Sequence, residues 1–339
     1  MKSTAIASLS RRAFLQSAAI SAAAAGVSPL THAADAPSGK AQIVISLDLE
    51  MSAQYPRRDI TQWNYEKGNL DDATKEYSVG AARLVKELGG VIHFFCVGRV
   101  LEQPSVEWLK EIAAGGHPVG NHTYDHVNLL ARKPEETQFR FQRSPWLIEG
   151  MQTSEIIRQN IRLTTAALKA RAGIAESGFR TPGGFAQGLS EREDVQQMLL
   201  DLGYKWVSSK YPAHDAGKPK EVPGEGVYQS IIEAQAAAQP VVYPSGLVEL
   251  PMSPISDVNA FRSNYWKLEY FLKALRLGVE RAIETRGVFV LLAHPSCLVV
   301  EDPKMESLRL LCTLAKEHAQ RAELVDLEAV YQRVKGKTK

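Results

Sequence analysis

Short runs of apolar and β-branched residues recur along the chain, and longer stretches with apolar positions at helical spacing separate them. The short runs predict strands at residues 42–49, 91–97, 118–121, 178–180, 205–208, 247–250, 288–293 and 323–325. The longer stretches predict helices at 70–88, 105–114, 153–172, 190–202, 265–285 and 305–320. This alternation is typical of a parallel sheet with helices packed outside it, which is the α/β class.

The number of strand–helix units favours one closed or nearly closed (β/α) barrel of about seven or eight parallel strands. We expect it to form a single domain over residues 40–335. A doubly wound open sheet is the alternative, although no Gly-x-Gly-x-x-Gly follows the first strand. Three long irregular stretches, at 52–69, 127–152 and 211–245, are long enough to shape a binding site.

The first residues have the pattern of an export signal. Lys2, Arg11 and Arg12 precede a mildly apolar stretch at 13–27, and small residues follow. The segment 10–16 resembles the twin-arginine signal. We therefore expect residues 1–33 to be a signal peptide, with cleavage after Ala33 or Ala36. That implies the twin-arginine translocase as a partner, a periplasmic or secreted bacterial protein, and no stable membrane span after cleavage.

Composition excludes several classes of protein. The chain has 339 residues, of which 45% are hydrophobic and 23% charged, so neither a disordered chain nor a disulfide-stapled miniprotein is expected. Lys and Arg number 40 against 38 Asp and Glu, without a basic stripe, so nucleic acid is not an expected partner. There are three cysteines and no Cys-x-x-Cys, which leaves no support for a zinc knuckle.

Polar residues with possible chemical roles lie at the ends of the predicted strands. Asp48 and Glu50 point the same way at the end of the first strand, because alternate side chains share a face. His122 and His126 are four residues apart, a spacing that brings two imidazoles together on one helical turn. Each feature also has a simpler interpretation, as solvated acids at a strand end or two unconnected imidazoles on a surface turn.

Two further strands end in basic side chains. Arg180 is followed by Pro182 and Gly183 in a turn whose backbone could face a ligand, and His294 ends the strand 288–293. The carboxyl ends of the strands converge on one face of a (β/α) barrel, so all these side chains could meet there. Two histidines and one carboxylate would leave open positions on a Zn²⁺-like ion.

The order of these motifs resembles the polysaccharide deacetylase family, also called carbohydrate esterase family four. The motifs are Ser-Leu-Asp-Leu-Glu, His-Thr-x-x-His, Arg-x-Pro and Leu-x-x-His. The resemblance implies a distorted (β/α) barrel that removes N-acetyl groups from amino sugars with a divalent metal. Zn²⁺ is the expected ion, and Co²⁺ or another divalent cation is the alternative. The expected substrate is an amino-sugar polysaccharide or oligosaccharide.

The resemblance also implies roles for individual residues. Asp48 corresponds to the general base, His294 to the general acid, and Arg180 to the residue that orients Asp48. His122 and His126 correspond to metal ligands. The common family pattern has two adjacent acids, whereas this chain has an acid-x-acid variant, in which Glu50 is the third ligand.

Further residues are assigned less directly. Pro182, Gly183, Trp63 and Tyr55 are expected to contact substrate, although the aromatic residues could instead pack under their loop. An aromatic residue often stands where this chain has Gly183. No clear match to the family's Asp and Trp motif is found, and Glu249 is the expected partner of His294.

Three alternatives to the deacetylase stay open at this point. The first is a hydrolase of the same fold that acts on a small cyclic amide or imide, and Gly183 favours it. The second is a carbohydrate-binding protein that has lost catalysis. The third is an oxygenase that uses Fe²⁺ in a two-His-one-carboxylate site.

Overall fold

The computed structural model describes residues 39–59 and 62–337. The predicted signal peptide, residues 1–33, lies outside the described residues. Within the described part, no helix is both long enough and apolar enough to cross a membrane.

One sheet contains the strands of the described residues. They are β1 (Ala41–Leu49), β2 (Ile92–Cys96), β3 (Val119–Asn121), β4 (Phe179–Phe185), β5 (Trp206–Lys210), β6 (Val241–Val242), β7 (Val248–Glu249), β8 (Val288–Ala293) and β9 (Ala322–Leu324). The strand order is β6-β7-β5-β4-β3-β2-β1-β8, and β9 also pairs with β1. All pairings are parallel except β6 with β7. The predicted parallel α/β sheet is therefore confirmed.

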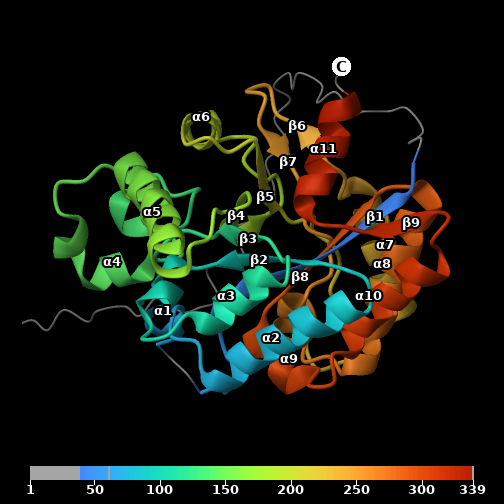
Figure 1. Ribbon diagram of the computed structural model, residues 1–339. Helices are drawn as coiled ribbons and strands as arrows, with labels where there is room; N and C mark the ends of the chain where they lie inside the picture. The colour runs from blue at the N-terminus through green and yellow to red at the C-terminus, as the bar shows by residue number, and fades with distance from the viewer. Residues whose placement is uncertain (1–38, 60–61, 338–339) are drawn as a thin grey trace, which may run out of the picture. The chain divides into compact units, whose positions relative to one another are not determined.

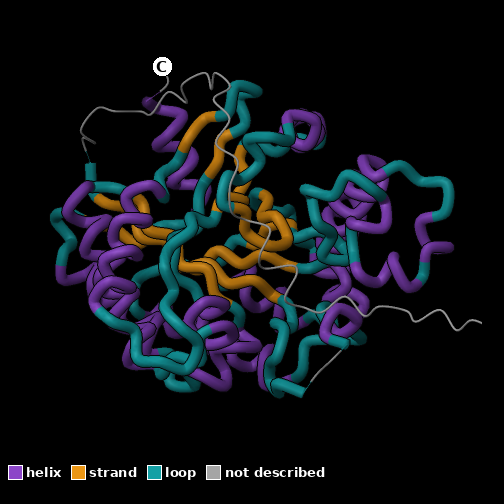
Figure 2. The backbone as a smooth tube through the Cα atoms, turned by 180° about the vertical axis from the view of Figure 1, so that it is seen from behind, coloured by secondary structure: helices purple, strands orange, loops and turns teal. Residues whose placement is uncertain are grey.

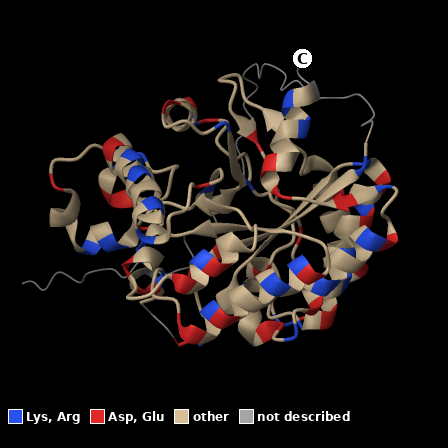
Figure 3. Ribbon diagram, in the orientation of Figure 1, with Lys and Arg blue, Asp and Glu red and all other residues tan. Residues whose placement is uncertain are grey.

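Helices surround this sheet, which occupies the centre in the rear view (Figure 2). The α-helices are α1 (Trp63–Glu66), α2 (Asp72–Glu87), α3 (Glu107–Ala114), α4 (Phe139–Arg143), α5 (Thr153–Ala167), α6 (Glu193–Asp201), α7 (Glu225–Ala237), α8 (Leu268–Thr285), α9 (Pro295–Glu301), α10 (Glu306–Glu317) and α11 (Leu327–Lys337). In Figure 1, α3, α2, α9 and α10 lie together below the strands. Acidic and basic residues are interspersed over the outer faces of these helices (Figure 3).

The barrel is only partly closed by strand pairing, since the path of the sheet ends at β8 on one side and β6 on the other. The segment 250–256 crosses the remaining gap. The Met252 amide donates to the Lys210 carbonyl beside β5, and the Ser253 amide donates to the Val290 carbonyl of β8. The fold is thus the expected distorted barrel, with an irregular segment in place of a closing strand.

The two faces of β1 divide the interior. One face packs against the surrounding helices in a large hydrophobic cluster, which includes Ile43, Ile45, Leu47 and Leu49. Val44 points the other way, into a smaller cluster inside the sheet that includes residues of β2, β5 and α11. Because side chains alternate along a strand, Asp48 lies on this inner face.

Several elements differ from the sequence prediction: α1, α4, α9, α11 and β6 were not predicted, and α7 and β4 are further cases. Helix α7 lies within the stretch 211–245, which we expected to be irregular. Its apolar residues are interrupted by Gly and a run of Ala, so the helical period is weak in the sequence. Strand β4 continues past Arg180 to Phe185, with a shift of register between these residues. Pro182 and Gly183 therefore lie within an irregular strand, where a turn was predicted.

Candidate metal centre and acid–base site

Two carboxylates lie at the carboxyl end of the central strand β1. Asp48 is 3% exposed and Glu50, just after the strand, is 2% exposed. Both neighbours of β1 in the sheet, β2 and β8, are parallel to it, so this end of the strand lies among other strand ends. Burial of two acids at one point requires nearby positive charge.

The two histidines of the His-Thr-x-x-His motif lie in the loop after β3. Thr123 and His126 have left-handed backbone conformations, with φ of 57° and 58°, so the helical turn predicted from their spacing is wrong. The Thr123 amide donates to Oδ1 of Asn121 at 2.9 Å, and the Thr123 carbonyl accepts from the Gly98 amide. These bonds hold a tight loop that nevertheless brings the rings of His122 and His126 to 5.1 Å between centroids.

Glu50, His122 and His126 form a cluster whose ligand atoms all lie within 4.8 Å of one another. Oε2 of Glu50 is 3.0 Å from Nε2 of His126 and 3.8 Å from Nε2 of His122. The same carboxylate oxygen is buried and takes part in no hydrogen bond. Such an orphaned oxygen beside two imidazole nitrogens is the donor set that a divalent cation requires.

The protonation of the rings agrees with this interpretation. Nδ1 of His122 lies 3.0 Å from the Arg180 carbonyl, which can only accept, so Nδ1 carries the proton and Nε2 presents a lone pair. Burial lowers the pKa of His122, against the opposing effect of Asp48, and lowers the pKa of His126 to about 4. Burial disfavours the charged form of Glu50, yet His126 and Lys67 hold its pKa well below the usual range. At neutral pH the three groups are therefore lone-pair donors, and they fit a metal ion.

Asp48 is held beside this cluster by Arg180. Nη1 of Arg180 donates to Oδ1 of Asp48 at 2.8 Å, while its Nη2 donates to the hydroxyls of Ser46 and Ser208. Arg180 is fully buried, and its guanidinium lies over the ring of Phe95, 4.3 Å from the centroid. Oδ2 of Asp48 faces Nε2 of His122 at 3.7 Å. One carboxylate oxygen is thus fixed and the other is directed into the site.

His294 lies on the opposite side of Glu50. Its Nε2 is 3.5 Å from Oε1 of Glu50, and its Nδ1 is 3.1 Å from both oxygens of Asp257. The Asp257 carboxylate also accepts the backbone amide of His294 at 2.8 Å. Burial disfavours the charged ring, but Asp257 and Glu50 raise the pKa of His294 to about 10. The ring is therefore protonated at neutral pH.

The predicted pairing of His294 with Glu249 is wrong. Oε1 of Glu249 accepts the backbone amides of Ser209 and Lys210 at 2.7 and 2.8 Å, and its Oε2 accepts the hydroxyl of Tyr243. Glu249 therefore ties β7 to the end of β5. Since β7 has only two residues, the sequence pattern could not show which way the Glu249 side chain points.

The four residues predicted to contact substrate differ in their exposure to solvent. Tyr55 is 3% exposed and its hydroxyl donates to Glu301 at 2.6 Å, so its ring packs under the loop. Trp63 and Tyr55 both line a pocket of about 420 Å³. Pro182 is buried, whereas Gly183 is exposed, and a side chain added there would meet no atom within 4 Å.

Two side chains of the site were missed from the sequence. Lys67 follows α1 in a stretch expected to be irregular, and its Nζ contacts Oε1 of Glu50 and lies 3.3 Å from Nε2 of His126. Asp257 precedes the π-helical segment η5 (Val258–Ser263), and its position was unpredicted because this segment has no regular period. The only sequence signal for Asp257 is that it is the single charged residue in the run 251–261.

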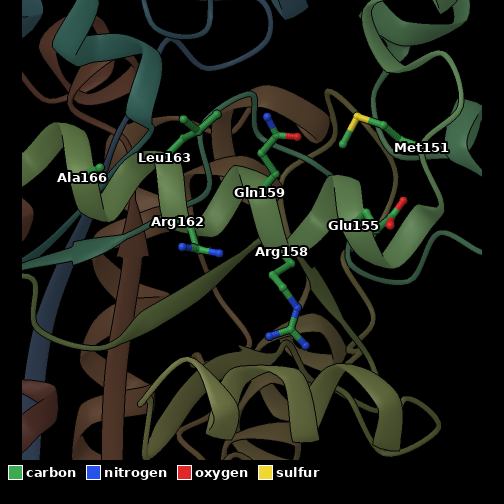
Figure 4. Close-up of a pocket in the computed structure, with 7 residues that line it drawn as sticks. All are labelled: Met151, Glu155, Arg158, Gln159, Arg162, Leu163 and Ala166. Carbon is green, nitrogen blue, oxygen red and sulfur yellow. The ribbon is translucent and has the colours of Figure 1, made fainter.

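A second pocket, of about 650 Å³, lies along α5 and is lined by Glu155, Arg158 and Arg162 among others (Figure 4). None of the predicted site residues lines it.

The fold and the site together define the class of protein, which is an α/β barrel with a Glu–His–His cluster that fits a divalent cation, beside a buried Asp and a buried His. Comparison with known families adds to this description. The model of the polysaccharide deacetylase family matches residues 69–207, which include His122, His126 and Arg180. Over these residues, the match confirms the resemblance drawn from the sequence.

Individual relatives agree with this match. A chitooligosaccharide deacetylase from Azorhizobium caulinodans is 33% identical over 67 residues, which are 20% of this chain and 31% of the relative. The matched part thus spans about a third of that protein. A crystal structure from Mycobacterium smegmatis, provisionally named a polysaccharide deacetylase, has a TM-score of 0.58 and 17% identity. That alignment covers 89% of this chain and 93% of the other, and it shows a shared fold.

Proposed function

We propose that the protein is a metal-dependent hydrolase that removes N-acetyl groups from an amino-sugar polysaccharide or oligosaccharide. The observation that carries the proposal is the cluster of lone-pair donors formed by Glu50, His122 and His126. Asp48, the candidate base, lies beside His122, and His294, the candidate acid, lies beside Glu50. Hydrolysis of an amide needs both groups, because an attacking water must lose a proton and the leaving amine must gain one.

The metal would be held by Oε2 of Glu50 and Nε2 of both histidines. When bound, a divalent cation at this position would polarise the acetyl carbonyl and lower the pKa of a water. Zn²⁺ is the ion we propose, because a carboxylate with two imidazoles suits it.

The chain's own residues would supply the proton transfers. Oδ2 of Asp48 accepts the proton of the attacking water, while Arg180 keeps Oδ1 fixed so that the carboxylate cannot rotate away. Nε2 of His294 donates a proton to the departing nitrogen. Asp257 holds Nδ1 of His294, which fixes the ring and keeps it charged.

A glycan is the substrate we favour, since the curated relative is a chitooligosaccharide deacetylase. A second candidate is a small cyclic amide or imide. It is favoured by Gly183, which offers no side chain to contact a sugar, and by Tyr55, which is buried under its loop.

A panel of substrates separates these two functions. Purified protein with Zn²⁺ is incubated with N-acetylated chitin oligomers and, separately, with small cyclic amides and imides. We expect acetate release from the oligomers and no ring opening of the cyclic compounds. Ring opening without acetate release would assign the protein to the second function, and turnover of neither would remove support for both.

We also propose that the protein is exported by the twin-arginine route to the periplasm or beyond. The support is the pattern of Arg11, Arg12 and the apolar stretch after them. Sequencing of the mature amino terminus is expected to begin at residue 34 or 37. A mature protein that still begins at Met1 would contradict this.

A further inference from the structure

A lysine lies inside the candidate metal centre. The Lys67 side chain is 3% exposed, and its Nζ contacts Oε1 of Glu50. The same nitrogen is 3.3 Å from Nε2 of His126 and lies over the ring of Trp63, 4.6 Å from its centroid. A lysine is rarely buried without a paired charge, so Glu50 is its partner.

The backbone holds this lysine in place. The Lys67 carbonyl accepts the amide of Met51, directly after Glu50, at 2.9 Å. Gly68 packs so closely on Arg99 that an added Cβ would lie 2.3 Å from the Arg99 Cβ. The main chain on both sides of the lysine is therefore fixed, and the ammonium is directed at Glu50 by the fold.

Two buried ion pairs hold the acids of the site. Arg180 contacts Oδ1 of Asp48, and Lys67 contacts Oε1 of Glu50. All four side chains are at most 5% exposed. A dication at Oε2 of Glu50 must therefore share that carboxylate with an ammonium already on Oε1.

We propose that Lys67 is a built-in counter-ion of Glu50, which stabilises the metal-free site and weakens the binding of the divalent cation. This inference rests on the proposed metal site. Lys67 occupies Oε1 and leaves only Oε2 to coordinate, so Glu50 can offer the ion one oxygen. Repulsion between the ammonium and a dication would be strong because both Lys67 and Glu50 are buried, where charges are poorly screened.

The test compares Zn²⁺ binding and thermal unfolding in the wild type and Lys67→Met. Methionine keeps a similar length without the charge. In metal-free protein, the variant leaves Glu50 buried without its partner, so its Tm should fall by about 5 °C or more. Titration calorimetry should show at least about tenfold tighter Zn²⁺ binding in the variant, and Zn²⁺ should raise its Tm more than that of the wild type.

Lys110→Met is the matched control. Lys110 pairs with Glu107 at 2.7 Å on the exposed face of α3, so its loss should leave Zn²⁺ affinity unchanged. Lys67→Gln is a second variant, which keeps a donor for Glu50 without the charge and should also bind Zn²⁺ more tightly. A Lys67→Met protein that folds only with Zn²⁺ would support the proposal.

Unchanged or weaker Zn²⁺ binding in both Lys67 variants would overturn the proposal and would make Lys67 a supporting residue for the ligands. The proposed function would survive that result. Failure of the wild type and all variants to bind Zn²⁺ would contradict the metal site itself, and the inference with it.

Discussion

Asp48 has one oxygen fixed by Arg180 and the other directed at His122, a member of the cluster of candidate metal ligands. Replacement of Asp48 by Asn keeps the shape of the side chain but removes the proton acceptor. We expect turnover to fall by about 100-fold to 10,000-fold, because a positioned base contributes about that much. Zn²⁺ affinity should change little, since Asp48 is not one of the three ligand residues. Acetate release and calorimetry measure the two quantities, and full activity of Asp48→Asn would remove Asp48 as the base.

Burial of His93 makes the free energy of unfolding depend on pH, independently of catalysis. His93 is fully buried on β2, stacks on Phe95 at 4.8 Å between centroids, and shares a hydrogen bond with the Ser177 carbonyl. Burial lowers its pKa to about 3. Below pH 6.5 the unfolded chain binds a proton at this ring and the folded protein does not, so stability is lost as the pH falls from 6.5 toward 3.

The variant His93→Gln should show less of this acid sensitivity. Between pH 7 and pH 4.5 we expect the wild type to lose about 2 to 3 kcal/mol more unfolding free energy than the variant. Urea denaturation at a series of pH values measures the difference. Parallel stability curves for the two proteins would contradict the buried neutral state of His93.

At the residue scale, the sequence was informative wherever a polar side chain ended an apolar run. Asp48, Arg180 and His294 were found in this way, and the structure brings them to one place. Lys67 and Asp257 were not found, because each comes from an irregular segment whose path depends on distant contacts. The Lys67 carbonyl, for example, is held by the amide of Met51, a contact that no local pattern encodes.

Functional side chains lie next to the ends of helical segments as well as strands. The π-helical segment η5 begins directly after Asp257, which it holds against His294. In Asp257→Asn the ring loses its charged partner but keeps a neutral one. We expect kcat to fall by about 10-fold to 100-fold, as for other partners that orient a functional histidine, with unchanged Zn²⁺ affinity. Steady-state kinetics beside calorimetry measures both, and a Zn²⁺ affinity that falls together with kcat would indicate a general structural role instead.

The approach of β4 to β5 depends on a glycine. Gly178 has φ of +72°, and an added Cβ would lie 1.9 Å from the ring of Trp206. Gly178→Ala should therefore lower the free energy of unfolding by about 3 kcal/mol or more. Gly226→Ala in α7 is the control, since it meets no atom within 4 Å and should be neutral or stabilising by up to about 1 kcal/mol. Equal denaturation midpoints for the two variants would contradict the close packing at Gly178.

Among the elements, long apolar runs were predicted well and short or weakly periodic ones were not. Strand β8 was predicted with its observed ends, whereas β6 has two residues and no pattern. The His-Thr-x-x-His motif shows a further limit. Its spacing correctly suggested that two rings would meet, but the cause is a loop with left-handed residues and not a helical turn.

At the scale of the whole molecule, the parallel sheet explains why residues far apart in the sequence meet. Asp48 lies one residue before the end of β1, Arg180 lies in β4 just before its register shifts, and His294 directly follows β8. Parallel strands run in the same direction, so these positions lie on the same side of the sheet. The alternation of strands and helices predicted this arrangement. The gap between the two ends of the sheet was not predicted, because the segment 250–256 that crosses it has no strand pattern.

The proposed hydrolysis depends most on Glu50, His122 and His126, which would hold the ion that the reaction needs. The direct measurement is acetate release from N-acetylated chitin oligomers by metal-stripped protein during titration with Zn²⁺. We expect no turnover at the start, recovery that reaches its plateau at about one Zn²⁺ per chain, and no recovery in His126→Ala. Full turnover by the stripped protein, or normal recovery in His126→Ala, would contradict the account.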